Sequence, residues 1–308
     1  TFKSKHTNDL KNFNPVKKMK VAYLRVFISL GIGVGLMACS NSTSEENEKV
    51  EVKEDTKIIS LNGTITEVLY AAGVGDKIVG VDVTSTYPAE VNQLPKLGHV
   101  RKLNVESMIG LQPDIVFTKE GEVSPEIKSK LKNGGAQVVS LEQKYTVAGT
   151  KAFIKSILKT VDAEDQFEAI STKIDQDLEK VQPLSSQPKV LFVYARGAGT
   201  LMVAGQNTQM DAIIELAGGV NAAQGFESFK PLTSEAVVTA APDAILMFNS
   251  GKASLQETGV WNIPGIQATP AGENQNLITM DAQLLSGFGP RLGEAVVELN
   301  TALQDIEK

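Results

Sequence analysis

The chain has 308 residues, of which 42% are hydrophobic and 21% are charged. This length exceeds what one compact core usually holds, so we expect two domains of ordinary size. The hydrophobic content excludes a largely disordered chain. Beyond residue 38 the chain has 23 basic and 35 acidic side chains, a net charge of −12. We therefore expect no nucleic-acid partner, because phosphates repel so acidic a surface.

The segment 1–38 contains an upstream extension and a signal-peptide pattern. Met19 is a plausible initiator, Arg25 supplies a basic charge, and 26–38 is an apolar run of 13 residues. This run is too short to cross about 30 Å of hydrocarbon comfortably, and no basic stop-transfer flank follows it. Small residues precede Cys39, the only cysteine of the chain, as in the lipobox of bacterial lipoproteins.

The lipobox pattern predicts that Cys39 becomes the lipid-modified N-terminus of the mature protein. Residues 39–55 are rich in Ser, Asn, Glu and Lys, which is typical of a flexible tether. We therefore expect an exported protein, anchored to a membrane through its lipid and located in the periplasm or at the cell surface.

The first folded elements form a β-α-β pattern. Residues 58–61 (IISL) are typical of a strand. Thr64 and Glu67 then have the spacing of a capping box, which predicts a helix start. An apolar run at 78–81 predicts a second strand that leads into a loop containing Tyr87.

Two segments of the chain repeat one pattern. Glu106 is followed seven residues later by Pro113, and Glu235 is followed seven residues later by Pro242; an Asp and an apolar run follow each proline. In each copy we expect a short helix, a turn and a buried strand. A looser echo of the first β-α-β pattern begins at the apolar run 190–193. Together the echoes indicate two lobes of related order.

Between the two halves, apolar residues recur at helical spacing. The pattern runs from Phe153 to Val181, and Pro183 and Pro188 end it. We expect one long helix at 149–183 that joins the lobes and limits how far they move apart.

These elements predict an α/β fold with two Rossmann-like lobes, at 56–148 and 184–308, joined by the single long helix. Alternating strands and helices favour mainly parallel sheets, whose ligands bind at the carboxyl ends of the strands. We therefore expect the ligand site in the cleft between the lobes.

The residues give little support for an enzyme. A nucleophilic enzyme needs a base beside its nucleophile, and His99 is the only histidine after the signal segment. The sequence contains no nucleophile-elbow motif and no phosphate loop. One histidine also argues against zinc or manganese capture. We interpret Glu122 and Glu126 as solvated loop or helix charges.

Tyr87 is a candidate ligand residue because its loop follows the strand at 78–81. A phenolate is a hard anionic oxygen that suits ferric iron, including haem iron. On the residues alone, a tyrosine that packs at the strand end and hydrogen-bonds through its hydroxyl remains the alternative.

Five segments carry a family resemblance: 84–88 (TSTYP), 96–101 (KLGHVR), 204–208 (AGQNT), 216–221 (LAGGVN) and 287–291 (GFGPR). Together they resemble the haemin-binding proteins of bacterial haem ABC importers. These proteins belong to a wider group that also binds cobalamin and ferric siderophores. The resemblance covers about 56–308 and implies the same two-lobed architecture.

The resemblance implies that Tyr87 is the axial ligand of haem iron, with haem as the transported ligand. It also implies that Glu106 and Glu235 dock on arginines of a membrane permease, so a haem ABC permease and its ATPase are the expected partners. Haem propionates need cations. The candidate haem-contacting residues are Thr86, His99, Arg101, Arg196 and Arg291.

Two departures from the family pattern shape the expected iron site. Some haem binders have an arginine two residues after the tyrosine, where this chain has Ala89. Others supply a histidine from the second lobe, and this chain has none after His99. We therefore expect five-coordinate iron held by Tyr87, assisted by Arg101 or Arg196, in a monomeric protein.

Three alternatives remain open from the sequence. The ligand of the same kind of importer could be cobalamin or a ferric siderophore. The chain could be a surface enzyme that modifies a tetrapyrrole. It could also store or relay haem without a permease.

Overall fold

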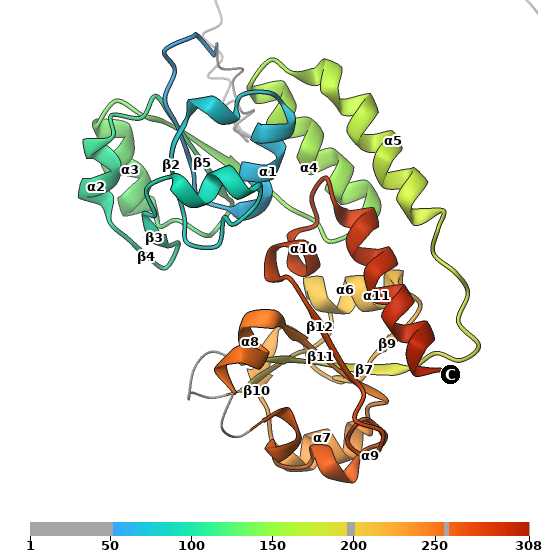
Figure 1. Ribbon diagram of the computed structural model, residues 1–308. Helices are drawn as coiled ribbons and strands as arrows, with labels where there is room; N and C mark the ends of the chain where they lie inside the picture. Colours follow the sequence, from blue (N-terminus) through green and yellow to red (C-terminus); the bar gives the residue numbers. More distant parts are fainter. Residues whose placement is uncertain (1–51, 196–200, 256–258, 308) are drawn as a thin grey trace, which may run out of the picture. The chain divides into compact units, whose positions relative to one another are not determined.

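The computed structural model describes residues 52–195, 201–255 and 259–307. Four residues named above lie outside this part of the chain: Met19, Arg25, Cys39 and Arg196. Within it, two β-sheets form the centres of two lobes, and helices pack on both faces of each sheet (Figure 1).

The N-terminal lobe has a four-stranded sheet in the order β2-β1-β5-β6, with every neighbouring pair parallel. Its strands are β1 (Ile58–Ser60), β2 (Ile78–Val81), β5 (Ile115–Lys119) and β6 (Gln137–Leu141). Its helices are α1 (Gly63–Ala71), α2 (Val105–Gly110), α3 (Pro125–Asn133) and α4 (Val147–Thr160).

Successive residues of β1 pack on opposite faces of this sheet. Ile58 belongs to a core with Phe153 of α4, whereas Ile59 belongs to a second core with Met108 of α2. Both isoleucines are fully buried. A strand covered on both faces needs apolar side chains in both directions, which explains the two consecutive isoleucines at 58 and 59.

The C-terminal lobe contains six strands, with β7-β11-β12 parallel and β8 and β10 antiparallel at one edge. The strands are β7 (Lys189–Tyr194), β8 (Met202–Ala204), β9 (Val220–Asn221), β10 (Phe229–Pro231), β11 (Ala244–Phe248) and β12 (Leu277–Met280). The helices are α6 (Gln209–Leu216), α7 (Ser234–Ala240), α8 (Asn249–Ser254), α9 (Pro270–Glu273), α10 (Ala282–Gly287) and α11 (Leu292–Ile306).

The parallel strands of the two lobes follow one plan. β9 pairs with β7, so β9-β7-β11-β12 repeats the order β2-β1-β5-β6. α2 precedes β5 and α7 precedes β11, as the Glu-to-Pro repeat predicted. Two lobes built on parallel sheets are therefore confirmed, and β8 and β10 are additions to the second.

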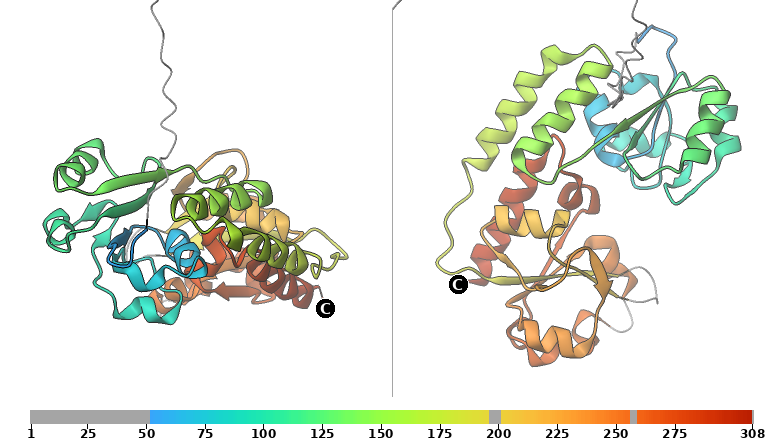
Figure 2. Two further views of the ribbon diagram at one scale, coloured as in Figure 1. Left: turned by 90° about the horizontal axis from the view of Figure 1, so that it is seen from above. Right: turned by 180° about the vertical axis from the view of Figure 1, so that it is seen from behind.

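The connection between the lobes differs from the single long helix that we expected. α4 ends at Thr160, and α5 (Phe167–Leu178) begins after a break that contains Asp162 in the left-handed region, with φ 58°. The chain turns back there, so α4 and α5 lie side by side (Figure 2). The apolar spacing was correct for each helix, but the pattern does not reveal the reversal. The domain boundaries at 148 and 183 stay predictions.

α5 is held by a close contact with the last helix of the chain. A side chain at Gly293 of α11 would place its Cβ 2.5 Å from the Cβ of Asp177 and 2.8 Å from the carbonyl oxygen of Ile174. Only glycine allows this approach of the two backbones. α5, the second helix of the connection, is thus packed against the C-terminal lobe.

Candidate functional site

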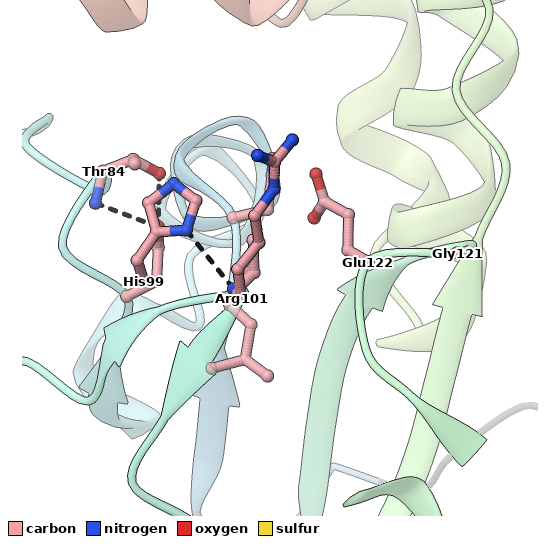
Figure 3. Close-up of a pocket in the computed structure, with 9 residues that line it drawn as sticks. Thr84, His99, Arg101, Gly121 and Glu122 are labelled. Carbon is pink, nitrogen blue, oxygen red and sulfur yellow. Dashed lines mark hydrogen bonds between the residues drawn. The ribbon is translucent and has the colours of Figure 1, made fainter. Parts of the chain in front are cut away.

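A pocket of about 300 Å³ opens at the carboxyl ends of β1, β2 and β5 in the N-terminal lobe (Figure 3). This is where parallel α/β sheets usually bind ligands. The pocket is lined by Leu61, Asn62, Asp82, Thr84, His99, Val100, Arg101, Gly121 and Glu122. Its walls are mainly polar, and two of the haem-contacting candidates lie in them.

His99 and Arg101 are placed by a two-stranded hairpin, β3 (Gly98–His99) and β4 (Lys102–Leu103). Gly98 has φ 102°, and a Cβ there would lie 2.5 Å from the carbonyl oxygen of Lys102, so the tight hairpin requires glycine. The backbone N–H of Arg101 donates to Nδ1 of His99 at 3.3 Å. The structure therefore brings both sequence candidates to one wall of the pocket.

Glu122 stands opposite Arg101, and the two side chains point toward each other (Figure 3). One carboxylate oxygen lies 3.1 Å from Lys119 Nζ, while Oε2 is buried and has no hydrogen-bond partner among the described residues. The side chain is only 25% exposed, so our interpretation of Glu122 as a solvated charge was wrong. Glu126, in contrast, pairs with Lys130 along the exposed face of α3.

The loop that carries Tyr87 is folded around the buried carboxylate of Asp82. Asp82 accepts hydrogen bonds from the N–H and the hydroxyl of Thr84 and from the hydroxyl of Ser85, the last at 2.6 Å. Lys96 Nζ donates to the Ser85 carbonyl at 2.7 Å. Burial lowers the pKa of Lys96, although Asp82 opposes this. The loop is fixed internally, yet Tyr87 itself is 43% exposed.

Gln283 reaches this loop from α10 in the other lobe. Its Oε1 accepts from the N–H of Thr86 at 2.7 Å, the hydroxyl of Thr86 at 3.0 Å and the N–H of Tyr87 at 3.0 Å. Its Nε2 donates to the carbonyl of Gly63 at 2.9 Å. The side chain is buried. Gln283 thus joins the Tyr87 loop, the start of α1 and the C-terminal lobe.

Arg291 pairs with Glu67 across the lobes. Arg291 Nε and Nη2 donate to the two oxygens of Glu67 at 3.0 and 2.9 Å, and the guanidinium carbon lies 3.6 Å from the ring centre of Tyr87. Burial raises the pKa of Glu67, and Arg291 only partly offsets this. Burial alone would lower the pKa of Arg291, but Glu67 and the Tyr87 hydroxyl outweigh it and raise the pKa.

These contacts change two sequence interpretations. Arg291 was expected to face haem propionates, but its side chain is 18% exposed and bonded to Glu67. Thr64 and Glu67 do not form a capping box, because Asn62 caps α1 through the N–H groups of Thr64 and Ile65. The Thr64 hydroxyl instead donates to the Gly287 carbonyl at 2.6 Å, so both residues connect the lobes.

Sequence reasoning missed Gln283 and Glu67. A glutamine in a helix has no motif, and Glu67 matched a commoner local role. The only signal was indirect: Gln283 contacts segment 84–88 and Glu67 contacts segment 287–291, and both segments carry the family resemblance.

Glu106 and Glu235 lie at equivalent places away from these contacts. Each is exposed and is the second residue of its helix, α2 or α7. Asn104 and Thr233 cap these helices by accepting from the N–H groups of Ser107 and Ala236. A carboxylate at this place is favoured by the helix dipole, so the spacing alone does not assign a partner.

Two α/β lobes with loops gathered at the carboxyl ends of parallel strands are an architecture that binds ligands at those loops. The sequence matches the family described as Periplasmic binding protein over residues 58–284, and the chain belongs to that family. In the part that the structure describes, no helix has the length and hydrophobicity to cross a membrane.

Three relatives illustrate the similarity. The apo structure of a periplasmic haem-binding protein from Roseiflexus sp. RS-1 has a TM-score of 0.78 and 33% identity, covering 82% of this chain and all of that one. An ABC transporter substrate-binding lipoprotein of Bacillus subtilis is 30% identical and aligns over 82% of both chains. A vitamin B12-binding protein of Vibrio parahaemolyticus is 25% identical over 87% of this chain and 94% of its own.

Proposed function

We propose that this protein captures haem outside the cytoplasmic membrane and delivers it to the permease of an ABC importer. The observation that carries the proposal is Tyr87, an exposed phenol on a loop held from both lobes. Tyr87 is 43% exposed, and the same loop contributes Asp82 and Thr84 to the lining of the polar pocket.

The surroundings of Tyr87 suit an iron ligand. The Arg291 guanidinium lies over one face of the Tyr87 ring, 3.6 Å from its centre, and this cation–π contact holds the ring in place. Gln283 fixes the backbone of Tyr87 and limits the reorganisation needed on binding. Arg101 in the pocket wall is the described cation best placed to meet a propionate, with His99 and Thr86 as further contacts.

Haemin titration followed by visible spectroscopy tests the proposal. The wild-type protein is expected to give a Soret band and a phenolate charge-transfer band. Tyr87→Phe should lose the charge-transfer band and weaken haemin binding by more than about 100-fold. Loss of a residue that only supports a metal ligand usually weakens binding by about 10- to 100-fold, and loss of the ligand itself should weaken it more. Tyr70→Phe is the matched control, because it removes the hydroxyl of a tyrosine whose ring packs against Gly75. Equal haemin binding by the wild type and Tyr87→Phe would contradict the assignment.

Cobalamin is the second candidate, favoured by the similarity to a vitamin B12-binding protein. The cobalt of cyanocobalamin already has both of its axial ligands and needs no phenolate. Cyanocobalamin titrated into the same protein should leave its spectrum and the intrinsic fluorescence unchanged. Saturable cyanocobalamin binding that survives in Tyr87→Phe, without a haemin spectrum, would replace haem by cobalamin and keep the importer role.

Delivery requires docking on the permease, for which Glu106 and Glu235 are the proposed contacts. Both are exposed, equivalent in the two lobes and without an ion pair among the described residues. Glu106→Gln with Glu235→Gln should abolish haemin uptake by cells that depend on this protein while haemin binding stays intact. Normal uptake by the double variant would favour a haem store that works without a permease.

The lipid anchor on Cys39 would keep the protein at the membrane where the permease lies. The similarity to a Bacillus subtilis lipoprotein supports this part of the proposal. Cys39→Ser should release the protein into the soluble fraction, and mass spectrometry of the wild-type N-terminus should find an acylated cysteine. An unmodified wild-type cysteine would refute the anchor without affecting haem binding.

A further inference from the structure

Large apolar side chains are strongly exposed at four places in the described residues: Val83, Tyr87, Ile109 and Val238, at 45, 43, 38 and 46%. Val83 and Tyr87 belong to the candidate ligand loop. Ile109 and Val238 have no connection with that loop. They lie on α2 and α7, three residues after Glu106 and Glu235 respectively.

The spacing places each acid beside an apolar neighbour. Residues three apart on a helix lie on the same face, about 5–6 Å apart between Cβ atoms. In both helices the acid is the second residue and the apolar residue is the fifth. An acid with an exposed apolar residue one turn on is therefore repeated in the two lobes, although the sheets around them differ.

We propose that each lobe has a composite docking patch for the permease. The patches are Glu106 with Ile109 and Glu235 with Val238. The permease would offer each patch a cation beside an apolar depression. This inference rests on the proposed importer function and adds the apolar half of each contact. Among the described residues, neither acid forms an ion pair. Lys130, whose pKa Glu106 helps to raise, is paired with Glu126 instead. Unpaired acids on a helix end suit a cationic partner.

The two halves of a patch have separable effects. An exposed acid mainly raises the rate of encounter with a cationic partner, and salt screens that effect. A buried apolar side chain mainly slows dissociation, and salt does not screen it. An acid alone would give a fast but short contact. The apolar neighbour lengthens the contact while haem passes to the permease.

The test measures binding of the haem-loaded protein to the purified haem importer of the source organism in nanodiscs. Ile109→Ser and Val238→Ser should each dissociate about tenfold faster, at both low and high salt, while haemin binding stays normal. Ile109→Val and Val238→Ile are the matched controls and should behave as wild type. Glu106→Gln and Glu235→Gln should mainly slow association, and only at low salt.

The outcomes separate this inference from the proposed function. If the acid variants weaken docking while both serine variants dissociate at the wild-type rate, the composite patch is wrong and the importer role stands. If neither set changes docking, the docking assignment itself is lost. Binding to nanodiscs without permease provides a further check. If the serine variants lose as much binding there as on nanodiscs with permease, Ile109 and Val238 contact the lipid surface and the patch is wrong.

Discussion

The N-terminal lobe arranges four parallel strands below a loop that carries Tyr87, whereas the C-terminal lobe adds two antiparallel strands and supplies Gln283 and Arg291. Features that occur in both lobes, such as Glu106 and Glu235, lie on exposed helix starts. Features that occur once surround Tyr87. The comparison motivates our assignment of the duplicated features to the proposed docking surface and of the single features to the proposed ligand site.

The largest expected effect comes from the asymmetric pair of Glu67 and Arg291. Arg291→Met leaves a buried carboxylate without its cation, and breaking a buried pair in this way costs about 3 kcal/mol or more of unfolding free energy. Urea unfolding measures the loss. Glu67→Leu combined with Arg291→Met should recover most of the stability, because no charge is then left buried. A single variant as stable as wild type would mean that Glu67 does not depend on Arg291.

The same variant has a predictable pH dependence. Burial raises the pKa of Glu67, so the folded protein binds its proton more tightly than the unfolded chain does. In Arg291→Met the carboxyl protonates as the pH falls through this raised pKa, and the charged form no longer has to be buried. The difference in unfolding free energy between wild type and Arg291→Met should therefore decrease from pH 7 toward pH 5. A gap that widens on acidification would contradict the pairing.

Gln283 gives the next largest effect and separates lobe contact from ligand contact. Gln283→Ala removes the acceptor of the N–H groups of Thr86 and Tyr87, which should cost about 2 kcal/mol and weaken haemin binding about tenfold or more. Gln143 is the matched control because it also crosses the lobes, donating to Gly287 and Phe288, without touching the loop. Gln143→Ala should lose stability but keep the haemin spectrum. Equal haemin affinities in the two variants would contradict a role for Gln283 in holding Tyr87.

Local patterns were enough to predict the two lobes, because strands buried on both faces leave continuous apolar runs and each short helix has its own start and turn signals. The equivalence of Glu106 and Glu235 followed from spacing alone. In contrast, Glu67 was assigned to a cap, because a capping box is a local pattern and its true partner lies 224 residues away. The reversal at Asp162 was also missed, since α4 and α5 each keep helical spacing.

The ligand loop marks the limit of sequence reasoning most clearly. The place of Tyr87 after β2 was predictable, and a phenol has the chemistry of an iron ligand. The contacts of Gln283 and Arg291 with it depend on how two lobes meet, which no periodicity encodes. For the same reason Arg291 was expected to meet propionates, whereas the fold gives it a carboxylate and an aromatic ring first.

Duplicated caps should have equal and moderate effects. Asn104→Ala and Thr233→Ala each remove a side chain that accepts a backbone N–H at the start of α2 or α7, and each should cost about 1 kcal/mol. Neither change should alter the haemin spectrum, because both caps lie away from the Tyr87 loop. Chemical denaturation and haemin titration of the two variants provide the check. A cap variant with altered haemin affinity would break the separation between duplicated and single features.

The smallest effect concerns Glu307, a single feature at the end of α11. Its carboxylate accepts from the N–H groups of Ser185 and Ser186 and from the Ser186 hydroxyl, and these bonds lower its pKa to about 2. A depressed carboxyl pKa stabilises the fold above the ordinary value of 4.5, and this stabilisation is lost as the pH falls toward 2. Glu307→Gln should therefore lower the Tm slightly at pH 7, and the difference should shrink by pH 3. A Tm difference that is the same at both pH values would show that these bonds do not depend on the charge, and the attachment of the connection to the C-terminal lobe would then rest on the contact of α5 with α11.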